Sequence, residues 1–428
     1  MPSPIRLGIA GIGTVGTGVL KILQSQSHLI AKRSGRTVEL VALCARSREK
    51  DRGVEISHYA WENDPVSLAA RNDIDVFVEL IGGSEGEALE AVKTALKTGK
   101  DVVTANKAML ALHGQKLAEK AEANDLVLRF EAAVAGGIPV IKSLMEGLAG
   151  NSIFRVMGVM NGTCNYILTR MQSAGLTYQD AFNEADSLGY LEADPNLDVG
   201  GIDAAHKLSL LSAIAFGTKI DFENIELEGI QEVTISDIRH AADMGFRIKL
   251  LGVTQITARG LEQRMSPCLV PANSPLGQLE GGTNMVVIEG DQVEQITLQG
   301  PGAGEGPTAS AVMGDIIDIA RGFRVSTFGI PSADMQMPTP ARSALSTPYY
   351  LRMALEDKPG ALAKVASELG NAGISINRMR QYRHDDDTAP VIIVTHDSTQ
   401  DAIDQALNAI SGIDIMRGTP VAMRIESV

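Results

Sequence analysis

The 428-residue sequence has few cysteines, few aromatic residues and no long apolar run. Its three cysteines, Cys44, Cys164 and Cys268, are odd in number and widely spaced, which argues against a disulfide framework or a zinc site and favours a reducing cytoplasm. The longest apolar stretches, such as 208–216, are far shorter than the roughly 18 residues that suggest a membrane span. The start of the chain also lacks the pattern of a signal peptide. We therefore expect neither export nor a membrane partner.

Positive charge is scarce as well. The chain carries 38 Lys and Arg against 52 Asp and Glu, and its formal net charge is −14. Such a surface repels phosphate backbones, and no basic cluster reverses this locally, so nucleic acid is not an expected partner. The length exceeds the roughly 250 to 300 residues at which a single core stops growing, so we expect two or three domains.

What the sequence does contain is an alternation of strand and helix patterns over residues 1–150. This rhythm predicts βαβ units and a parallel, Rossmann-type sheet in a dinucleotide-binding domain of the α/β class. The expected strands are 5–11, 38–45, 76–82, 101–105 and 126–134.

Further along the chain the pattern changes twice. Mixed strands and longer helices predict an α+β domain over 151–328 for substrate binding, catalysis and dimerisation, with a helix at 307–325 that returns to the first domain. The proline-containing segment 329–348 has the composition of a linker. Residues 349–428 follow the order strand, helix, strand, strand, helix, strand, which predicts a ferredoxin-like βαββαβ unit.

A glycine-rich turn follows the first expected strand. Gly11, Gly13 and Gly16 form a G-x-G-x-x-G pattern, with Thr14 and Val15 inside it, that opens a predicted helix. In this setting the glycines allow a tight turn, close approach of a pyrophosphate and close helix packing, and the helix N-terminus attracts phosphate. The alternative is a purely structural turn, since the pattern alone is a weak signal.

The end of the second expected strand bears on the choice of cofactor. An NAD-selective enzyme usually places an acidic residue there, but this chain has Arg46, with Arg48 nearby. Arg46 could face a 2′-phosphate, so the sequence favours NADP over NAD. The alternative is that Arg46 is only a solvated loop charge.

The helix that starts near Asp203 places two charges on an apolar face. Asp203 and Lys207 share one arc with Leu210, Leu211 and Ile214. One interpretation is an N-terminal capping Asp with an i,i+4 lysine partner, worth a few tenths of a kcal/mol. The other is a functional site, and periodicity alone does not separate the two.

Five segments together resemble the homoserine dehydrogenase family. They are GIGTVG at 11–16, TANK at 104–107, EAAVAGGIP at 131–139, GYLEADPNLDVGGIDAAHK at 189–207 and GPGAGEGPTA at 300–309. They follow the family order and span about the first 320 residues. The resemblance implies oxidation of L-homoserine to L-aspartate 4-semialdehyde, or the biosynthetic reverse, with a hydride moving to or from a nicotinamide.

The resemblance also implies roles for charged residues. Lys107 and Lys207 would line the active site, and Lys207 would transfer the proton at the substrate hydroxyl. Glu192 and Asp203 would bind the substrate ammonium, and Asp198 would support the same pocket. A lysine can exchange a proton near neutral pH if burial or a second ammonium lowers its pKa from about 10.4 towards 7 or 8, and we expect the two lysines to perturb one another in this way.

For the cofactor, the resemblance places Thr104, Ala105 and Lys107 near the nicotinamide. Gly304, in the second glycine-rich loop, would also contact the cofactor, although this loop could be only a flexible turn. The segment 131–139 resembles the family's monovalent cation loop. Sodium would be bound there by oxygen atoms alone, as suits a hard cation. The implied ligands are Glu131 and the backbone carbonyls of Val134, Gly136 and Ile138. Without the resemblance this segment is a strand-to-helix turn.

The C-terminal unit carries D-x-P-G-x-L at 357–362 and N-x-G-I-x-I at 371–376. This pair of motifs resembles the ACT domain, which commonly binds amino acids and often pairs with a second copy. The resemblance implies an effector pocket, with threonine the favoured ligand, and a homodimer or homotetramer. The implied pocket residues are Asp357, Pro359, Gly360, Asn371, Gly373 and Ile374. The alternative is an ACT-like dimerisation unit without a ligand.

Two other classes of protein compete with this reading. One is another Rossmann amino-acid or semialdehyde dehydrogenase, and the other is a non-catalytic nucleotide sensor that reports through its ACT unit. Glu192, Asp203 and Lys207 argue against the sensor, because a sensor does not need a lysine on an apolar helical face.

Overall fold

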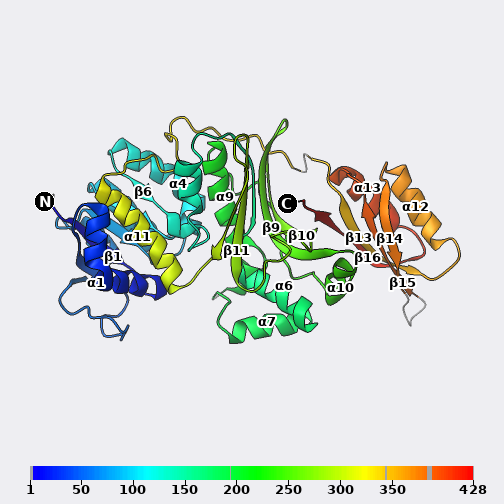
Figure 1. Cartoon of the computed structure of the whole chain (residues 1–428), viewed down its shortest axis with the longest axis horizontal. Helices are drawn as coiled ribbons and strands as arrows, with labels where there is room; N and C mark the ends of the chain where they lie inside the picture. The colour runs from blue at the N-terminus through cyan, green and yellow to red at the C-terminus, as the bar shows by residue number, and fades with distance from the viewer. Residues whose placement is uncertain (1–2, 193, 343–344, 383–387, 428) are drawn as a thin grey trace.

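The computed structural model describes residues 3–192, 194–342, 345–382 and 388–427. Three units lie in a row, and the last strand of the chain ends between the second and the third (Figure 1). Residue 193 of the family-like segment, 343–344 of the expected linker, and 383–387 and 428 of the expected third domain lie outside the described residues.

The first unit contains a parallel sheet with the strand order β3-β2-β1-β4-β5-β6, which confirms the Rossmann-type prediction. The strands are β1 (Ile5–Ala10), β2 (Val38–Cys44), β3 (Ala60–Glu62), β4 (Val76–Glu79), β5 (Asp101–Thr104) and β6 (Leu128–Arg129). The helices are α1 (Thr14–Ser34), α2 (Pro65–Ala70), α3 (Glu87–Lys97) and α4 (Lys107–Ala123). The central strands β1, β4 and β5 are largely buried and mostly apolar, because helices cover both faces of a parallel sheet.

The strand predicted at 126–134 is wrong over most of its length. Only β6 is extended, and a 3₁₀ turn, η1 (Glu131–Ala133), follows it. The backbone N–H of Glu131 donates to Asp315, and the Glu131 carboxylate accepts from the backbone N–H groups of Ile141 and Lys142. These bonds turn the chain away from the sheet and into α5 (Val140–Lys142) and a π-helical turn, η2 (Ser143–Gly147).

A helix from late in the chain, α11 (Glu305–Arg321), packs on α1 of the first unit (Figure 1). Val312 and Ile316 of α11 share one apolar cluster with Leu7 and Val19. The two helices are so close that a Cβ atom at Gly18 would lie 2.8 Å from the backbone oxygen of Glu305. The first unit is therefore built from two separate stretches of the chain.

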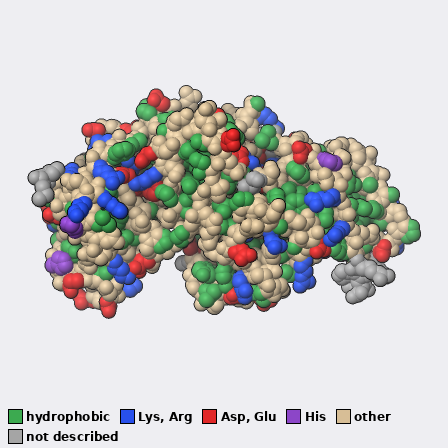
Figure 2. Space-filling view, viewed as in Figure 1, with side chains coloured by type: hydrophobic (Ala, Val, Ile, Leu, Met, Phe, Trp, Pro, Cys, Tyr) green, Lys and Arg blue, Asp and Glu red, His purple; other side chains and the backbone are tan. Residues whose placement is uncertain are grey.

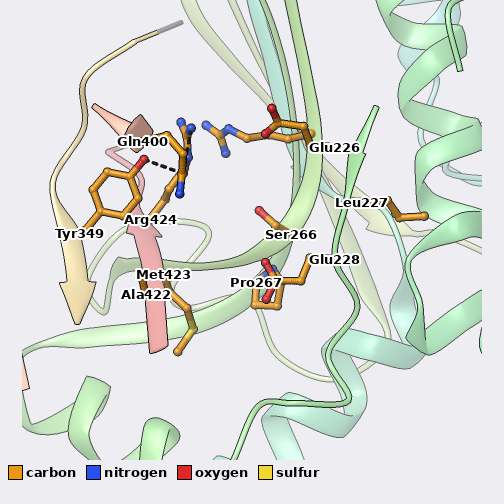
Figure 3. A pocket seen from close by; sticks show the side chains of 11 residues that line it. Glu226, Leu227, Glu228, Ser266, Pro267, Tyr349, Gln400, Ala422, Met423 and Arg424 are labelled. Atoms are coloured by element: carbon orange, nitrogen blue, oxygen red, sulfur yellow. Dashed lines mark hydrogen bonds between the residues drawn. The ribbon is translucent and has the colours of Figure 1, made fainter. Parts of the chain in front are cut away.

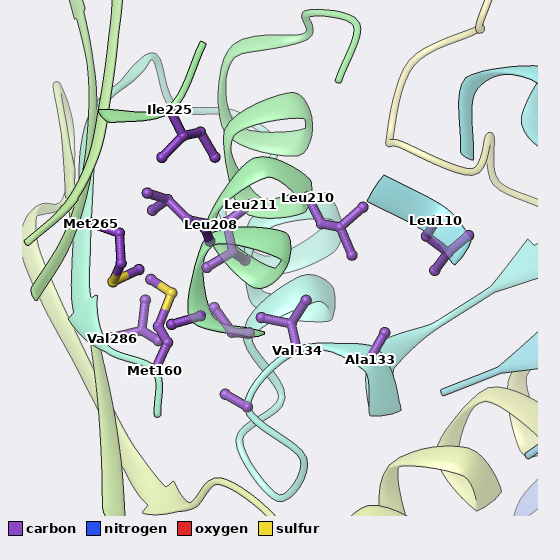
Figure 4. Close-up of a cluster of buried hydrophobic side chains, with 14 of the residues drawn as sticks. Leu110, Ala133, Val134, Met160, Leu208, Leu210, Leu211, Ile225, Met265 and Val286 are labelled. Atoms are coloured by element: carbon purple, nitrogen blue, oxygen red, sulfur yellow. The ribbon is translucent and has the colours of Figure 1, made fainter. Parts of the chain in front are cut away.

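The central unit is a mixed sheet covered by helices. Its strands are β7 (Ile153–Val159), β8 (Glu226–Leu227), β9 (Phe246–Thr257), β10 (Gly260–Pro271), β11 (Thr283–Gly290) and β12 (Glu294–Pro301). Its helices are α6 (Gly162–Ala174), α7 (Tyr178–Ser187), α8 (Pro195–Val199), α9 (Ile202–Phe216) and α10 (Ile235–Asp243). Helix α9 lies between this sheet and the first unit (Figure 4). Ser209 and Ser212 are also buried, so α9 has no solvated face in its middle turns.

The third unit confirms the predicted βαββαβ order. Its elements are β13 (Tyr349–Glu356), α12 (Ala361–Asn371), β14 (Ile376–Gln381), β15 (Thr388–Thr395), α13 (Gln400–Ser411) and β16 (Met416–Ile425). Strand β16 also pairs in parallel with β10 of the central unit, so the two sheets are continuous. The sequence pattern did not predict this junction.

One buried and one partly buried ion pair reinforce the junction between the second and third units. The Glu426 carboxylate, just beyond β16, accepts from Arg264 and from Arg155 at 2.5 Å each. The segment expected to be a linker is also attached, because the backbone of Thr339 and Ala341 bonds to Leu261. The third unit is therefore attached to the central sheet by strand pairing and ion pairs, and not only by the linker segment.

The surface carries both signs of charge. On the face shown in Figure 2, basic and acidic side chains are interspersed over all three units. None of the helices in the described part of the chain has the length and apolar character to cross a membrane.

Candidate active site

A cavity of about 610 Å³ lies between the first and central units. It opens where the chain leaves the carboxyl ends of β1, β5 and β6, which is where open parallel sheets bind ligands. The predicted site residues that line it are Thr14, Val15, Ala105, Lys107, Gly136, Glu192, Asp198, Asp203, Lys207 and Gly304.

The glycine-rich turn has the geometry that a dinucleotide needs. Gly11 has a φ of +97°, and a Cβ atom at Gly16 would lie 2.1 Å from the Gly11 carbonyl oxygen, so strand and helix approach too closely for a side chain. Gly13, by contrast, faces open space. No side chain caps the start of α1, so its N–H groups can serve a pyrophosphate. The turn therefore fits the dinucleotide.

Arg46 is exposed and does not line the cavity. A neighbouring arginine that the sequence analysis missed connects this region to the glycine-rich turn. The Arg52 guanidinium donates to the backbone oxygens of Ile12 at 3.0 Å and Ser47 at 2.6 Å. It thereby holds the loop after β2, which carries Arg46, against the turn.

Charged side chains meet at the other end of the cavity. Lys107 Nζ, at the start of α4, lies 2.8 Å from Asp203 Oδ1 and 3.6 Å from Glu192 Oε1. Lys207 Nζ, one turn beyond Asp203 on α9, lies 2.6 Å from Asp203 Oδ2 and donates to the backbone oxygen of Met160 at 2.8 Å. One carboxylate, 4% exposed, is thus shared by two ammonium groups from different units. The N-cap of α9 is Gly201, so Asp203 is not a capping residue.

The pKa shifts at this end of the cavity differ from those expected for two neighbouring lysines. Burial alone would raise the pKa of Asp203, but Lys207 and Lys107 outweigh this effect and hold it well below its usual range. Burial alone would lower the pKa of Lys107, but Asp203 and Glu192 outweigh it and the pKa is raised. The expected lowering is therefore wrong for Lys107, because a carboxylate stands between the two ammonium groups.

Asn161 is a further site residue that the sequence analysis missed. Its amide Nδ2 donates to Asp198 at 2.9 Å and to Asp203 at 3.3 Å, while its oxygen accepts from the backbone of Cys164 and caps α6. Asp198 also accepts the backbone N–H of Glu192 at 2.9 Å. Asp198 therefore orients two of its neighbours. An Asn between an apolar run and a helical pattern is a recognisable N-cap signal, but it does not predict these tertiary contacts.

Thr104 does not reach the cavity, in contrast to Ala105. It is fully buried, and its hydroxyl donates to Glu79 at 2.5 Å. Glu79 also accepts the backbone N–H groups of Ile81 and Gly82. Thr104 therefore fixes the shape of the loops beside the site and does not line it.

The segment expected to bind a cation is tightly folded. Glu131 is buried, and burial together with nearby Asp315 raises its pKa to about 8. Gly136 lines the cavity, whereas Val134 and Ile138 are buried behind it. Three or more His, Cys, Asp or Glu side chains do not gather into a metal-binding group anywhere in the described ranges. A site built on backbone carbonyls would not produce such a group.

The expected effector residues lie at both ends of one helix. Asp357, Pro359 and Gly360 line a cavity of about 460 Å³ before α12. Asn371 ends α12, and Gly373 and Ile374 follow it, so these three do not line that cavity. A pocket containing both motifs would need a second copy of the unit.

A dinucleotide turn beside a pocket of two lysines and three carboxylates is typical of an NAD(P)-linked oxidoreductase that acts on a small molecule. Comparison with known proteins specifies this class further. Residues 11–131 match the homoserine dehydrogenase NAD binding domain, residues 139–317 match homoserine dehydrogenase and residues 349–412 match the ACT domain. The chain belongs to the homoserine dehydrogenase family, and the predicted family and ACT unit are confirmed.

Individual relatives agree with this assignment. A homoserine dehydrogenase from Neisseria gonorrhoeae is 42% identical over 433 residues, which cover 99% of both chains. The crystal structure of a homoserine dehydrogenase from Thiobacillus denitrificans has a TM-score of 0.94 at 38% identity and also covers 99% of both chains. A hyperthermophilic archaeal homoserine dehydrogenase in complex with NADPH has a TM-score of 0.62 at 30% identity, over 74% of this chain and 97% of that one.

Proposed function

We propose that the enzyme interconverts L-homoserine and L-aspartate 4-semialdehyde, in threonine and methionine biosynthesis. The observation that carries this proposal is the shared carboxylate of Asp203, with Lys107 and Lys207 on either side of it beside the dinucleotide turn. The substrate is a zwitterion with a hydroxyl group, and this pocket offers partners for the ammonium, the carboxylate and the hydroxyl.

We assign the steps to residues as follows. Glu192 and Asp203 bind the substrate ammonium, and Asp198 holds this acidic side of the pocket in place through Asn161. Lys207 takes the hydroxyl proton during oxidation and returns it in the reverse direction, while Lys107 orients the substrate. The bound nicotinamide supplies the hydride acceptor or donor, and the protein supplies orientation and proton transfer.

The test is a substrate panel. We expect NAD(P)H formation with L-homoserine and kcat/KM at least 100-fold lower with L-serine, L-threonine and 4-hydroxybutyrate, because these compounds misplace the hydroxyl or lack the ammonium. Equal activity with 4-hydroxybutyrate would show that Glu192 and Asp203 do not bind a substrate ammonium. Another substrate that is clearly preferred would assign the chain a different reaction.

For the cofactor we propose NADP, with NAD as a weaker alternative. The dinucleotide would lie against Gly11, Gly13, Thr14, Val15 and Gly16, and Gly304 would contact it from the second glycine-rich loop. Support comes from the basic loop after β2 and from the archaeal relative that was solved with NADPH. Arg46 is the candidate for the 2′-phosphate, and Arg52 holds its loop in place.

We expect Arg46→Asp to shift the ratio of kcat/KM for NADP to that for NAD towards NAD by about tenfold or more, since a charge-assisted bond contributes roughly 1.5–3 kcal/mol. Steady-state kinetics with both cofactors measures the ratio, and Arg33→Asp, at the far end of α1, is the control. A wild-type preference for NAD, or an unchanged ratio in Arg46→Asp, would leave Arg46 as a solvated loop charge.

We also propose that sodium binds at the loop of Glu131, Val134, Gly136 and Ile138. The protein is proposed to be cytoplasmic and to form a homodimer or homotetramer.

L-Threonine is the proposed effector at the ACT motifs. Paired third units would bring the first motif of one copy near the second motif of another, that is, Asp357, Pro359 and Gly360 near Asn371, Gly373 and Ile374. An effector changes activity only if it binds one state more tightly, and coupling of about 1–3 kcal/mol corresponds to about 5- to 150-fold.

A further inference from the structure

A second cavity, of about 210 Å³, lies at the joint between the central and third units (Figure 3). We call it the junction pocket. One wall comes from β8 and β10 and the other from β13, β16 and the start of α13. It is separate from the cavity that contains Lys207 and from the one that contains Asp357.

Two buried arginines face the junction pocket, and they differ in how well they are paired. Arg264, 3% exposed, donates to Glu426 at 2.5 Å. Arg424, 7% exposed, has hydrogen bonds to Glu262 and Gln400 that are both 3.4 Å long, beyond the usual upper limit of about 3.2 Å. A guanidinium that is removed from water needs close acceptors, so Arg424 is under-compensated where it borders the pocket. A carboxylate is the ligand group that best fits a guanidinium.

The orientation of Arg424 is fixed in advance. Its guanidinium carbon lies 5.7 Å from the ring centroid of Tyr349, and the Tyr349 hydroxyl donates to the same Gln400 oxygen that Arg424 contacts. Figure 3 shows these three side chains together on one side of the pocket. A preorganised arginine loses little freedom on binding an anion, which favours affinity.

The opposite wall carries groups of complementary chemistry. Glu226, Glu228 and Ser266 lie there, across from Arg424 (Figure 3). The backbone N–H of Glu228 bonds to the Met265 oxygen at 2.8 Å, which fixes Glu228 beside Ser266. A ligand with its carboxylate at Arg424 would thus present an ammonium towards Glu228. At roughly 30 Å³ per water molecule, the pocket volume corresponds to about seven waters, which suits a small molecule and excludes a peptide or nucleotide.

We propose that the junction pocket binds a free α-amino acid with a small side chain, its carboxylate on Arg424 and its ammonium towards Glu228. Because the two walls belong to different units, such a ligand bridges the joint and stabilises the attached arrangement of the ACT unit. The proposal does not depend on the substrate or on the effector proposed above.

The experiment is calorimetric titration of the full-length protein with glycine, L-alanine and L-serine, since L-threonine is the effector proposed for the ACT motifs. Acetate and ethanolamine serve as probes with only one of the two charges. We expect at least one amino acid to bind and both single-charge probes to bind at least tenfold more weakly. Arg424→Gln should weaken amino-acid binding at least tenfold while turnover of L-homoserine is retained. Arg380→Gln, a substitution in an exposed ion pair on β14, is the matched control and should leave binding unchanged.

Two further variants show which of the three cavities binds the amino acid. Asp357→Ala alters the cavity before α12, and Asp203→Asn alters the active site, so binding in the junction pocket should survive both. If Arg424→Gln does not fold, Ser266→Val replaces it as the test of binding in the junction pocket, because this substitution narrows the pocket without removing a charge. The proposal is overturned if none of the three amino acids binds, if Arg424→Gln and Ser266→Val bind as the wild type does, or if Asp357→Ala or Asp203→Asn abolishes binding.

Discussion

Replacement of Lys207 by methionine is expected to lower kcat with L-homoserine by about 10² to 10⁴, because the variant loses the group that exchanges the hydroxyl proton. Methionine has similar length, so the packing of α9 is largely kept. Nucleotide affinity should change little, since Lys207 lies at the charged end of the cavity, away from the glycine-rich turn. Steady-state kinetics, together with NADPH binding followed by fluorescence, measures both effects.

Two comparisons make this result specific to the proton-transfer role. Lys364→Met alters an exposed lysine of the third unit and should retain full turnover. The pH profile of the residual activity should lose the limb that reports the acid–base group. Near wild-type kcat in Lys207→Met would assign proton transfer to another group.

Asp203→Asn is expected to lower kcat/KM for L-homoserine by about 30- to 5,000-fold, which corresponds to the roughly 2–5 kcal/mol lost when one partner of a buried charge pair is removed. The asparagine keeps the shape of the side chain but leaves Lys107 and Lys207 without the carboxylate between them. The effect should fall on substrate binding and turnover together, whereas Asp401→Asn, on the surface of α13, should have no effect. Unchanged kcat/KM would show that the substrate ammonium binds elsewhere.

The same variant should alter the pH dependence. Burial lowers the pKa of Lys107, but Asp203 and Glu192 raise it by more, so removal of Asp203 should lower it and move the alkaline limb of kcat/KM to lower pH.

Asp203 also makes the stability of the fold depend on pH, in the direction expected for a carboxyl group whose pKa is lowered in the folded state. Because the folded-state pKa of Asp203 is depressed, its contribution is present above its unfolded pKa of about 3.9 and is lost as the pH falls further. Denaturant titrations of wild type and variant at pH 7 and pH 3 measure this difference.

The parts of the fold that could be predicted are those encoded by local pattern. The apolar strands of the first unit and the order of elements in the third are visible in the sequence because buried strands and amphipathic helices have characteristic periods. The spacing of Asp203 and Lys207 likewise indicates an i,i+4 pair on one helix. It does not indicate Lys107, which belongs to another unit and reaches Asp203 only in the folded chain.

The parts that could not be predicted depend on tertiary contacts. β6 is short because Glu131 bonds to Asp315 and to the amides of Ile141 and Lys142, partners 10 to 184 residues away. The pairing of β10 with β16 involves only two residue pairs, Cys268 with Arg424 and Leu269 with Ile425. A two-residue register leaves no recognisable mark on either strand. Asn161 resembles many helix-capping residues, and only the fold brings it to Asp198 and Asp203.

The origin of the first unit from two stretches of chain has a consequence for synthesis on the ribosome. The apolar side chains of α1 and of the adjoining strands are covered by α11, which ends at Arg321. Between residue 150 and residue 321 the nascent chain must grow by about 170 residues, which takes roughly 10–30 s at 5–20 residues per second. During that interval the first unit is exposed to solvent without α11, so the apolar side chains that α11 will cover remain uncovered. Nascent chains released before residue 321 should therefore aggregate or bind chaperones, whereas chains that include α11 can complete this unit before the ACT domain has been made.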